Sequence, residues 1–194
     1  MGADSGKYRS FTSYGALIDG VAVCDGYASA YRIMCLIEGI QCVEVIGTSN
    51  GVGHAWNKVF IDGLWYGVDS TWSRVANESL TLRYLLINEA QLIEGGHVEN
   101  DCGNDNETYI TFIASDGKDH YDISGRAIKD ASDIKRLVNA AAAEGVTVLE
   151  LKNASGKTLE QLFSGYGITD FNVKSLSYND EKNSDIVYIY LELE

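Results

Sequence analysis

The spacing of apolar and polar residues predicts an α+β protein. From Cys24 to Glu38 apolar side chains recur at steps of three and four, which predicts a helix with one mainly apolar face. Gly39 follows at the position where a left-handed residue commonly ends a helix. Residues 41–46 have the composition of a strand, and we expect residues 48–53 to form a loop.

A β-hairpin is the clearest local signal in the chain. Residues 54–61 and 64–69 are two strand-like runs separated only by Asp62 and Gly63, a pair that favours a two-residue turn with positive φ at both positions. In that register Trp56 lies opposite Asp69. Because side chains alternate between faces, His54, Trp56 and Asp69 share one face. His54 and Asp69 are then diagonal neighbours, roughly 7–8 Å apart at the backbone.

The pattern changes after a stretch rich in Asn, Asp and Gly from Val98 to Thr108. We therefore expect two domains, residues 1–100 and residues 107–194. The second is expected to be a small α+β domain without a catalytic grouping. Its predicted elements are strands at 108–114 and 120–123 with a turn at 116–117, a helix at 130–144, a strand at 146–151, a helix at 158–164, and strands at 171–178 and 186–193.

Composition narrows the range of partners. The formal net charge is −13, which argues against nucleic acid or an anionic membrane surface. A Lys-bearing peptide would fit this charge, although acidity that only maintains solubility is the simpler interpretation. No apolar run reaches membrane-spanning length and no signal-peptide core is present. The 4 cysteines are too few for a disulfide scaffold and lack zinc-site spacing, so we expect neither a structural metal nor a cofactor.

Three residues suggest thiol chemistry. Cys24 lies in the first turn of the predicted helix, where free N–H groups and the helix dipole favour a thiolate and can bind an oxyanion. Asp25 opposes that effect slightly, and Gly26 is expected to leave the space before the sulfur open. A hydrogen bond from His54 to Asp69 would orient the imidazole as a base. Each residue alone is more simply explained as structural, and the hairpin does not place Cys24 beside the other two.

A family resemblance connects them. Residues 13–17 and 20–28 resemble the nucleophile segment of bacterial transglutaminase-like domains, and residues 53–57 and 62–72 resemble their His and Asp segments. The order and spacing match over the first half of the chain. The resemblance implies a papain-like core, in which a nucleophile helix packs on an antiparallel sheet. It also implies a role for each of five residues: nucleophile Cys24, base His54, orienting residue Asp69, oxyanion donor Tyr14 and cleft wall Trp56.

Two features of the sequence depart from the family pattern. Ser70 stands where the family usually has Pro, which should alter the rigidity of the turn more than the chemistry. Only a short segment precedes Cys24, whereas many relatives place helices there. Either N-terminal elements are missing from the chain or the cleft has fewer walls.

The resemblance implies a cysteine-type peptidase or amidase that acts on a peptide or protein. The alternatives are a transglutaminase that links amines, and a non-catalytic cell-surface binding module on the same scaffold. A metal site made of Cys24, His54 and Asp69 is the least favoured alternative, since no fourth ligand is evident. Relatives imply an extracellular or cell-surface location, with the cytoplasm as the alternative. The sequence carries no signal for an oligomeric state.

Overall fold

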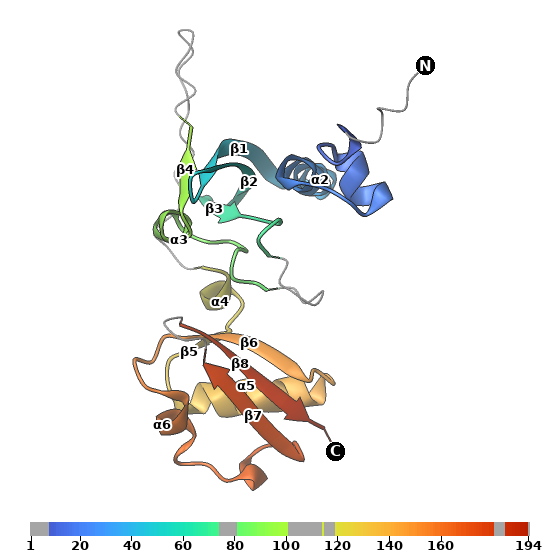
Figure 1. Ribbon diagram of the computed structural model, residues 1–194. Helices are drawn as coiled ribbons and strands as arrows, with labels where there is room; N and C mark the ends of the chain where they lie inside the picture. The colour runs from blue at the N-terminus through green and yellow to red at the C-terminus, as the bar shows by residue number, and fades with distance from the viewer. Residues whose placement is uncertain (1–7, 74–80, 101–113, 115–118, 181–184, 194) are drawn as a thin grey trace. The chain divides into compact units, whose positions relative to one another are not determined.

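The computed structural model describes residues 8–73, 81–100, 114, 119–180 and 185–193 of the 194-residue chain. The chain forms two compact units, residues 1–119 and 120–194, and both combine helices with strands (Figure 1). This confirms the mixed α+β class. The two predicted domains remain a prediction, because much of the stretch around Val98–Thr108 lies outside the described residues. So do most of the strand predicted at 108–114 and the turn at 116–117.

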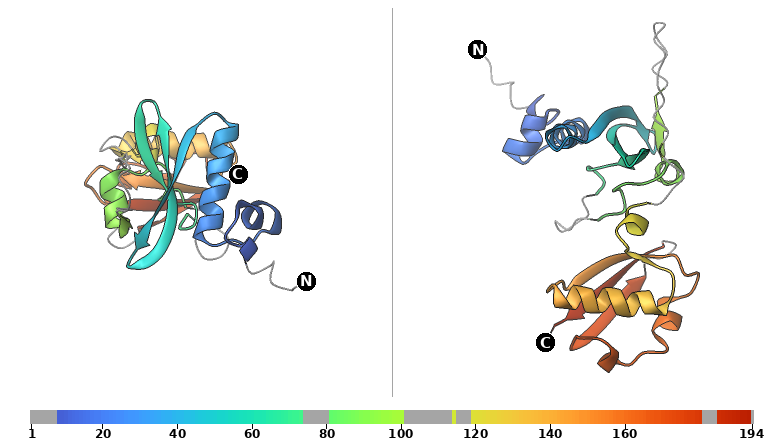
Figure 2. Two further views of the ribbon diagram at one scale, coloured as in Figure 1. Left: turned by 90° about the horizontal axis from the view of Figure 1, so that it is seen from above. Right: turned by 180° about the vertical axis from the view of Figure 1, so that it is seen from behind.

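The first unit is built on a four-stranded antiparallel sheet with the order β3-β2-β1-β4. Helix α2 lies to one side of this sheet and helix α3 to the other (Figures 1 and 2). A short π-helix, η1 (Gly15–Asp19), precedes α2. The bounds are α2 Cys24–Ile37, β1 Gln41–Ser49, β2 Val52–Ile61, β3 Leu64–Val68, α3 Glu89–Glu94 and β4 His97–Glu99.

Both hairpins of this sheet have two-residue turns. The predicted turn at Asp62 and Gly63 is confirmed, with φ of 52° and 84°. The predicted register is also confirmed along the ladder, which ends at the pair Asn57 and Val68. The loop predicted at residues 48–53 is wrong, because β1 continues to Ser49 and β2 begins at Val52. Asn50 and Gly51 form the turn with φ of 52° and 77°, and Asn-Gly is itself a strong hairpin signal.

Apolar side chains cover both faces of the sheet. The predicted helix is confirmed as α2, and Gly39 follows it with a φ of 75°. Between α2 and the sheet lies a core of Cys35, Cys42, Val59, Tyr66 and Val68. The other face is covered by a core of Trp56, Ile87, Leu92 and Ala114. Burial on both faces fixes the register, because a slip of one residue would exchange the two sets of side chains.

The second unit has its own sheet with the order β5-β6-β8-β7, in which β5 and β6 are parallel and the other pairs antiparallel. Helix α5 covers one face (Figure 2). The Asp130 side chain caps it by accepting from the backbone N–H groups of Ser132 and Asp133. The bounds are α4 His120–Ile123, β5 Ala127–Ile128, α5 Ala131–Ala143, β6 Val148–Asn153, α6 Leu159–Phe163, η3 Ile168–Asp170, β7 Ser175–Asp180 and β8 Ile186–Glu192.

Most predicted elements of this unit are confirmed with shifted ends, but the strand predicted at residues 120–123 is wrong. These residues form the single helical turn α4. The backbone N–H and the hydroxyl of Ser124 both donate to the carbonyl of His120, at 2.8 and 2.7 Å, and Gly125 ends the turn with a φ of 71°. Four residues are too few for periodicity to separate a strand from a helical turn. Within the described residues, no helix has the length and apolar character needed to cross a membrane.

Candidate active site

His54 and Asp69 form a buried hydrogen-bonded pair at the open end of the β2–β3 hairpin. Nε2 of His54 lies 2.7 Å from Oδ2 of Asp69. Asp69 follows the last residue of β3, and its backbone N–H donates to the carbonyl of Tyr84 at 2.9 Å. The hydrogen bond to a carboxylate requires a proton on Nε2, so the neutral imidazole has Nδ1 as its unprotonated nitrogen. The pair thus defines which nitrogen of His54 can accept a proton.

The Asp69 carboxylate is held by four donors. Oδ1 accepts from the backbone N–H groups of Thr71 and Trp72, at 2.9 and 3.0 Å. Oδ2 accepts from His54 and from a second histidine, His97, at 2.9 Å. Burial opposes the charge on this carboxyl group. The hydrogen bonds outweigh that penalty, and they hold the pKa of Asp69 below its ordinary value.

His97 is the residue that the sequence analysis missed. It is the first residue of β4, which pairs with the end of β1, and its ring is buried. Twenty-eight positions separate it from Asp69 along the chain. No local pattern of the sequence joins them, because β4 reaches the site only through the pairing of the sheet. The signal that the sequence offered was a histidine that follows the Asp segment.

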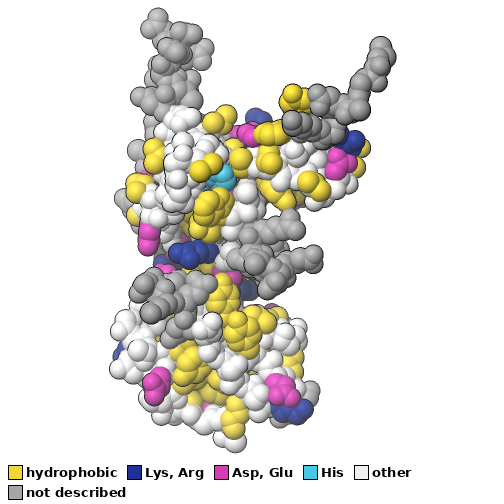
Figure 3. Space-filling model, viewed as in Figure 1, with side chains coloured by type: hydrophobic (Ala, Val, Ile, Leu, Met, Phe, Trp, Pro, Cys, Tyr) yellow, Lys and Arg dark blue, Asp and Glu magenta, His cyan; other side chains and the backbone are white. Residues whose placement is uncertain are grey.

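Aromatic rings surround the three polar side chains. The His54 ring stacks on Trp56 with centroids 6.1 Å apart, and the edge of Trp72 meets it at 5.8 Å. His97 contacts Trp56 at 5.0 Å and Tyr84 at 6.3 Å. Trp56 is buried but Trp72 is 37% exposed, so Trp72 brings one side of the cluster to the surface. In Figure 3, histidine atoms are visible at the surface of the first unit, and hydrophobic side chains surround them.

Cys24 begins α2, as predicted, and its thiol is free and half-buried. The helix runs in the same direction as β2. Asn57 on β2 donates to the carbonyl of Ala28 at 3.1 Å, whereas Cys35 packs further along, beside Val59. Cys24 therefore lies about one helical turn before Ala28, towards the end of β2 that carries His54. Within the described residues, no hydrogen bond links the Cys24 sulfur to His54 or Asp69.

The role predicted for Gly26 is wrong. A Cβ at this position would lie 2.5 Å from the carbonyl oxygen of Ser10 and 2.9 Å from that of Thr12. The N-terminal segment therefore packs backbone to backbone against the first turn of α2, and the N–H of Val23 donates to the same Ser10 carbonyl at 2.9 Å. Gly26 is needed for this close approach, and it does not leave open space in front of the sulfur.

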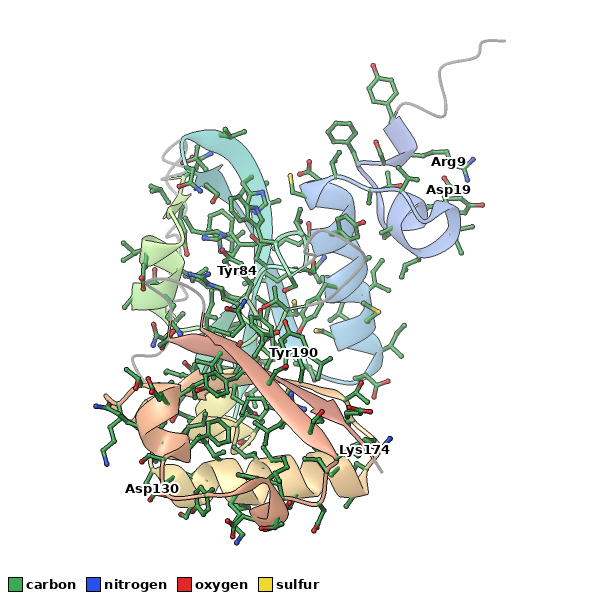
Figure 4. The ribbon with its side chains drawn as sticks, turned by 60° about the horizontal axis from the view of Figure 1, so that its bottom comes forward. Arg9, Asp19, Tyr84, Asp130, Lys174 and Tyr190 are labelled. Atoms are coloured by element: carbon green, nitrogen blue, oxygen red, sulfur yellow. The ribbon has the colours of Figure 1, made fainter. Side chains whose placement is uncertain are left out.

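Tyr14 lies on the N-terminal segment, next to η1. Its ring is 51% exposed, and the guanidinium of Arg9 lies over it at 4.3 Å. Arg9 also forms an ion pair of 2.7 Å with Asp19, and the two face one another in Figure 4. The contacts of Tyr14 within the described residues are thus local, and its predicted part as an oxyanion donor remains a prediction.

The metal site considered from the sequence combined Cys24 with His54 and Asp69. Among the described residues, the grouping whose donor atoms converge within 4.8 Å has His97 in place of Cys24. The hydrogen bonds of both imidazoles to Oδ2 account for this convergence without a metal ion.

The His–Asp pair on the hairpin and the Cys at the start of α2 are features for which the sequence resembles transglutaminase-like domains. In agreement, residues 3–70 match the family model described as the transglutaminase-like superfamily. The resemblance predicted from the sequence is thereby confirmed for this part of the chain. The matched segment contains Cys24, His54 and Asp69 and ends before His97.

Two curated relatives resemble the chain over a limited region. Kyphoscoliosis peptidase of Mus musculus is 40% identical over 76 residues, which cover 33% of this chain and 12% of the mouse protein. Kyphoscoliosis peptidase of Homo sapiens is 39% identical over 76 residues, with the same shares of each chain. The chain thus matches only a small part of the length of either relative.

Proposed function

We propose that this protein is a thiol-dependent acyl-transfer enzyme of the cysteine peptidase or amidase type, acting on a peptide or protein. The observation that carries the proposal is the hydrogen bond of 2.7 Å between His54 Nε2 and Asp69. It leaves Nδ1 as the nitrogen that can take a proton from a thiol. The family match and the peptidase name of the two relatives favour the same chemistry.

The proposed reaction has two halves. His54 Nδ1 takes the proton of the Cys24 thiol as Sγ attacks the carbonyl carbon of the amide, and the first N–H groups of α2 donate to the oxyanion. Nδ1 then returns the proton to the amine, which leaves as the C–N bond breaks and a thioester remains. Water attacks the thioester with His54 again as base, so the carboxylic acid leaves and the thiol is restored. Asp69 keeps the imidazole oriented throughout.

The proposed reaction requires the Cys24 thiol to reach the face of β2 that carries His54. Side chains alternate along β2, so His54 and Trp56 leave it on the face opposite to Asn57, which contacts α2. The ladder with β3 ends at Asn57, so β3 does not pair with β2 beside His54. We propose that the Cys24 thiol reaches His54 Nδ1 past this edge of β2, in a papain-like arrangement of helix and sheet.

Hydrolysis is proposed over amine transfer because no feature of the described residues selects an amine over water. Transglutaminase activity and a non-catalytic binding module are the alternatives. An extracellular or cell-surface location belongs to the proposal and is supported only by the family resemblance.

A peptide-library cleavage assay tests the proposal, with Cys24→Ala as the inactive variant. Cys35→Ala is the matched control, because it removes a buried thiol from the same helix. Cleavage by the native protein and by Cys35→Ala, but not by Cys24→Ala, is the expected result. Silence from all three would support the binding module. Mass spectrometry of a Gln peptide incubated with a primary amine separates hydrolysis from transfer, since transfer alone incorporates the amine.

A further inference from the structure

His97 is placed to make two hydrogen bonds, and both partners can only accept. Its Nε2 lies 2.9 Å from Oδ2 of Asp69, and its Nδ1 lies 3.2 Å from the carbonyl oxygen of Leu92. A carbonyl oxygen and a carboxylate have no proton to give. Both contacts are hydrogen bonds at the same time only if each ring nitrogen carries a proton, that is, if the ring is an imidazolium cation.

This cation compensates for the burial of Asp69. The carboxylate is fully buried, and a buried charge without a partner is strongly unfavourable. His54 cannot serve as a permanent counter-ion, because a base must be neutral at the start of each proton transfer. The backbone donors Thr71 and Trp72 carry no net charge. His97 is thus the group in contact with Asp69 that supplies a full positive charge while His54 is neutral.

Two other titratable groups of the described residues lie near His97. Tyr84 faces it with ring centroids 6.3 Å apart. Glu99, two residues further along β4, forms an ion pair with the buried Lys58, which also contacts Glu89 at 3.2 Å. Lys58 is thus shared between Glu89 and Glu99, and Asp69 is the carboxylate in contact with the His97 ring.

We propose that His97, as an imidazolium, is a positioning residue that keeps Asp69 ionised and aligned towards His54. The inference deepens the proposed function and rests on it. Among the described residues, no hydrogen bond or ion pair joins His97 to Cys24. It acts through Asp69, whose Oδ2 it shares with His54, so it fixes the oxygen against which the His54 ring is oriented.

Nitrogen-15 NMR of the native protein, labelled at histidine, tests the protonation directly. Near neutral pH the His97 ring is expected to show two protonated nitrogens. A bare nitrogen on His97 would overturn the inference. This measurement needs neither a variant nor a substrate, so it decides the question even if substitutions at His97 prevent folding.

The rate of Cys24 alkylation by iodoacetamide, followed against pH, tests the consequence. His97→Gln can keep one N–H donor but loses the charge. The variant is expected to alkylate roughly 10–100-fold more slowly at pH 7. The low-pH midpoint of its plot of rate against pH should move to higher pH, because a positive charge that favours the Cys24 thiolate has been removed. Ile87→Ala is the packing control, since Ile87 belongs to the core around Trp56, which His97 contacts, and its side chain cannot hydrogen-bond to Asp69. It should leave the midpoint in place.

The outcomes separate the two proposals. A folded His97→Gln protein with the native rate and midpoint would overturn the role of His97. If the native Cys24 reacts like an unassisted thiol, the proposed thiol chemistry fails. The NMR result then still decides whether His97 is the charged partner of Asp69.

Discussion

His54 and Asp69 meet at 2.7 Å although the β2–β3 ladder ends one residue before Asp69. The hairpin register makes the two residues diagonal neighbours, whose backbones are too far apart for contact without long side chains. The remaining gap is closed because Oδ1 of Asp69 is held by the backbone of residues 71 and 72, which leaves Oδ2 directed at the imidazole. The turn after β3 therefore determines the geometry of the site as much as the strands do.

Asp69→Asn should abolish most of the activity while the chain still folds. The amide has one acceptor oxygen, so it cannot satisfy two backbone N–H groups and two imidazoles as the carboxylate does. An amide nitrogen facing His54 would favour the tautomer with the proton on Nδ1, which cannot accept from Cys24. We expect kcat to fall by about 10²–10⁴-fold with little change in KM. A change in KM with kcat unchanged would contradict this role.

The stability contributed by Asp69 should depend on pH with a definite sign. Its pKa in the folded protein lies below the ordinary value of 3.8, so the folded state favours the ionised form. The contribution is fully present above pH 3.8 and is lost as the pH falls through the lower folded value. Urea unfolding should show Asp69→Asn destabilised by about 1–3 kcal/mol at pH 7, and the difference should shrink below pH 3.8. A difference that grows on acidification would contradict the assignment.

The sequence predicted the parts of the site that depend on local geometry. The Asp62–Gly63 turn sets the register, and the register puts His54 and Asp69 on one face, so both were within reach of pattern arguments. His97 was not, because it enters the site through the pairing of β4 with β1, which joins segments far apart in the chain. Gly26 was misjudged for a similar reason. The backbone of residues 10–12 that it contacts comes from a separate segment.

The two wrong secondary-structure predictions fall on short segments of the chain. The turn at residues 120–123 forms a helix because Ser124 and Gly125 close it locally. The loop predicted at 48–53 contains the Asn-Gly turn of a second hairpin. In both cases the signal lay in turn chemistry, and the apolar pattern was too short to decide.

Cys24 should be alkylated well before the two buried cysteines of the described residues. Burial raises the pKa of the Cys35 thiol, and it raises that of Cys42 to about 12. Both are therefore protonated at neutral pH and shielded from solvent. Peptide mapping by mass spectrometry after brief treatment with iodoacetamide should find the label on Cys24 and not on Cys35 or Cys42. Equal labelling of all three would argue against a distinct thiol environment at the start of α2.

The second unit should fold alone. Its core of fourteen buried side chains, which includes Ile134, Leu151 and Ile189, is drawn entirely from residues 128–191. A fragment of residues 120–194 is expected to unfold in a single cooperative transition, measured by circular dichroism in urea. Leu151→Ala in this fragment should lower the free energy of unfolding by about 2–5 kcal/mol. A fragment without a cooperative transition would show that the unit depends on the first.

Gly47 should be required for the strand pairing that brings His97 to the site. A Cβ on Gly47 would lie 2.1 Å from the carbonyl oxygen of Val98 and 2.8 Å from Cη2 of Trp56. Backbone atoms of β4 and a buried indole would both have to move. Gly47→Ala is therefore expected to cost about 1–3 kcal/mol of stability and to weaken the contact between His97 and Asp69.

Gly53→Ala is the matched control for Gly47→Ala, because no atom lies within 4 Å of a Cβ built on Gly53 and its φ is not positive. Urea unfolding and the His97 ring resonances should be unchanged in this control and altered in Gly47→Ala. If both variants behave like the native protein, β4 tolerates a shift away from β1. The contact of His97 with Asp69 would then not depend on the close approach of the two strands at Gly47.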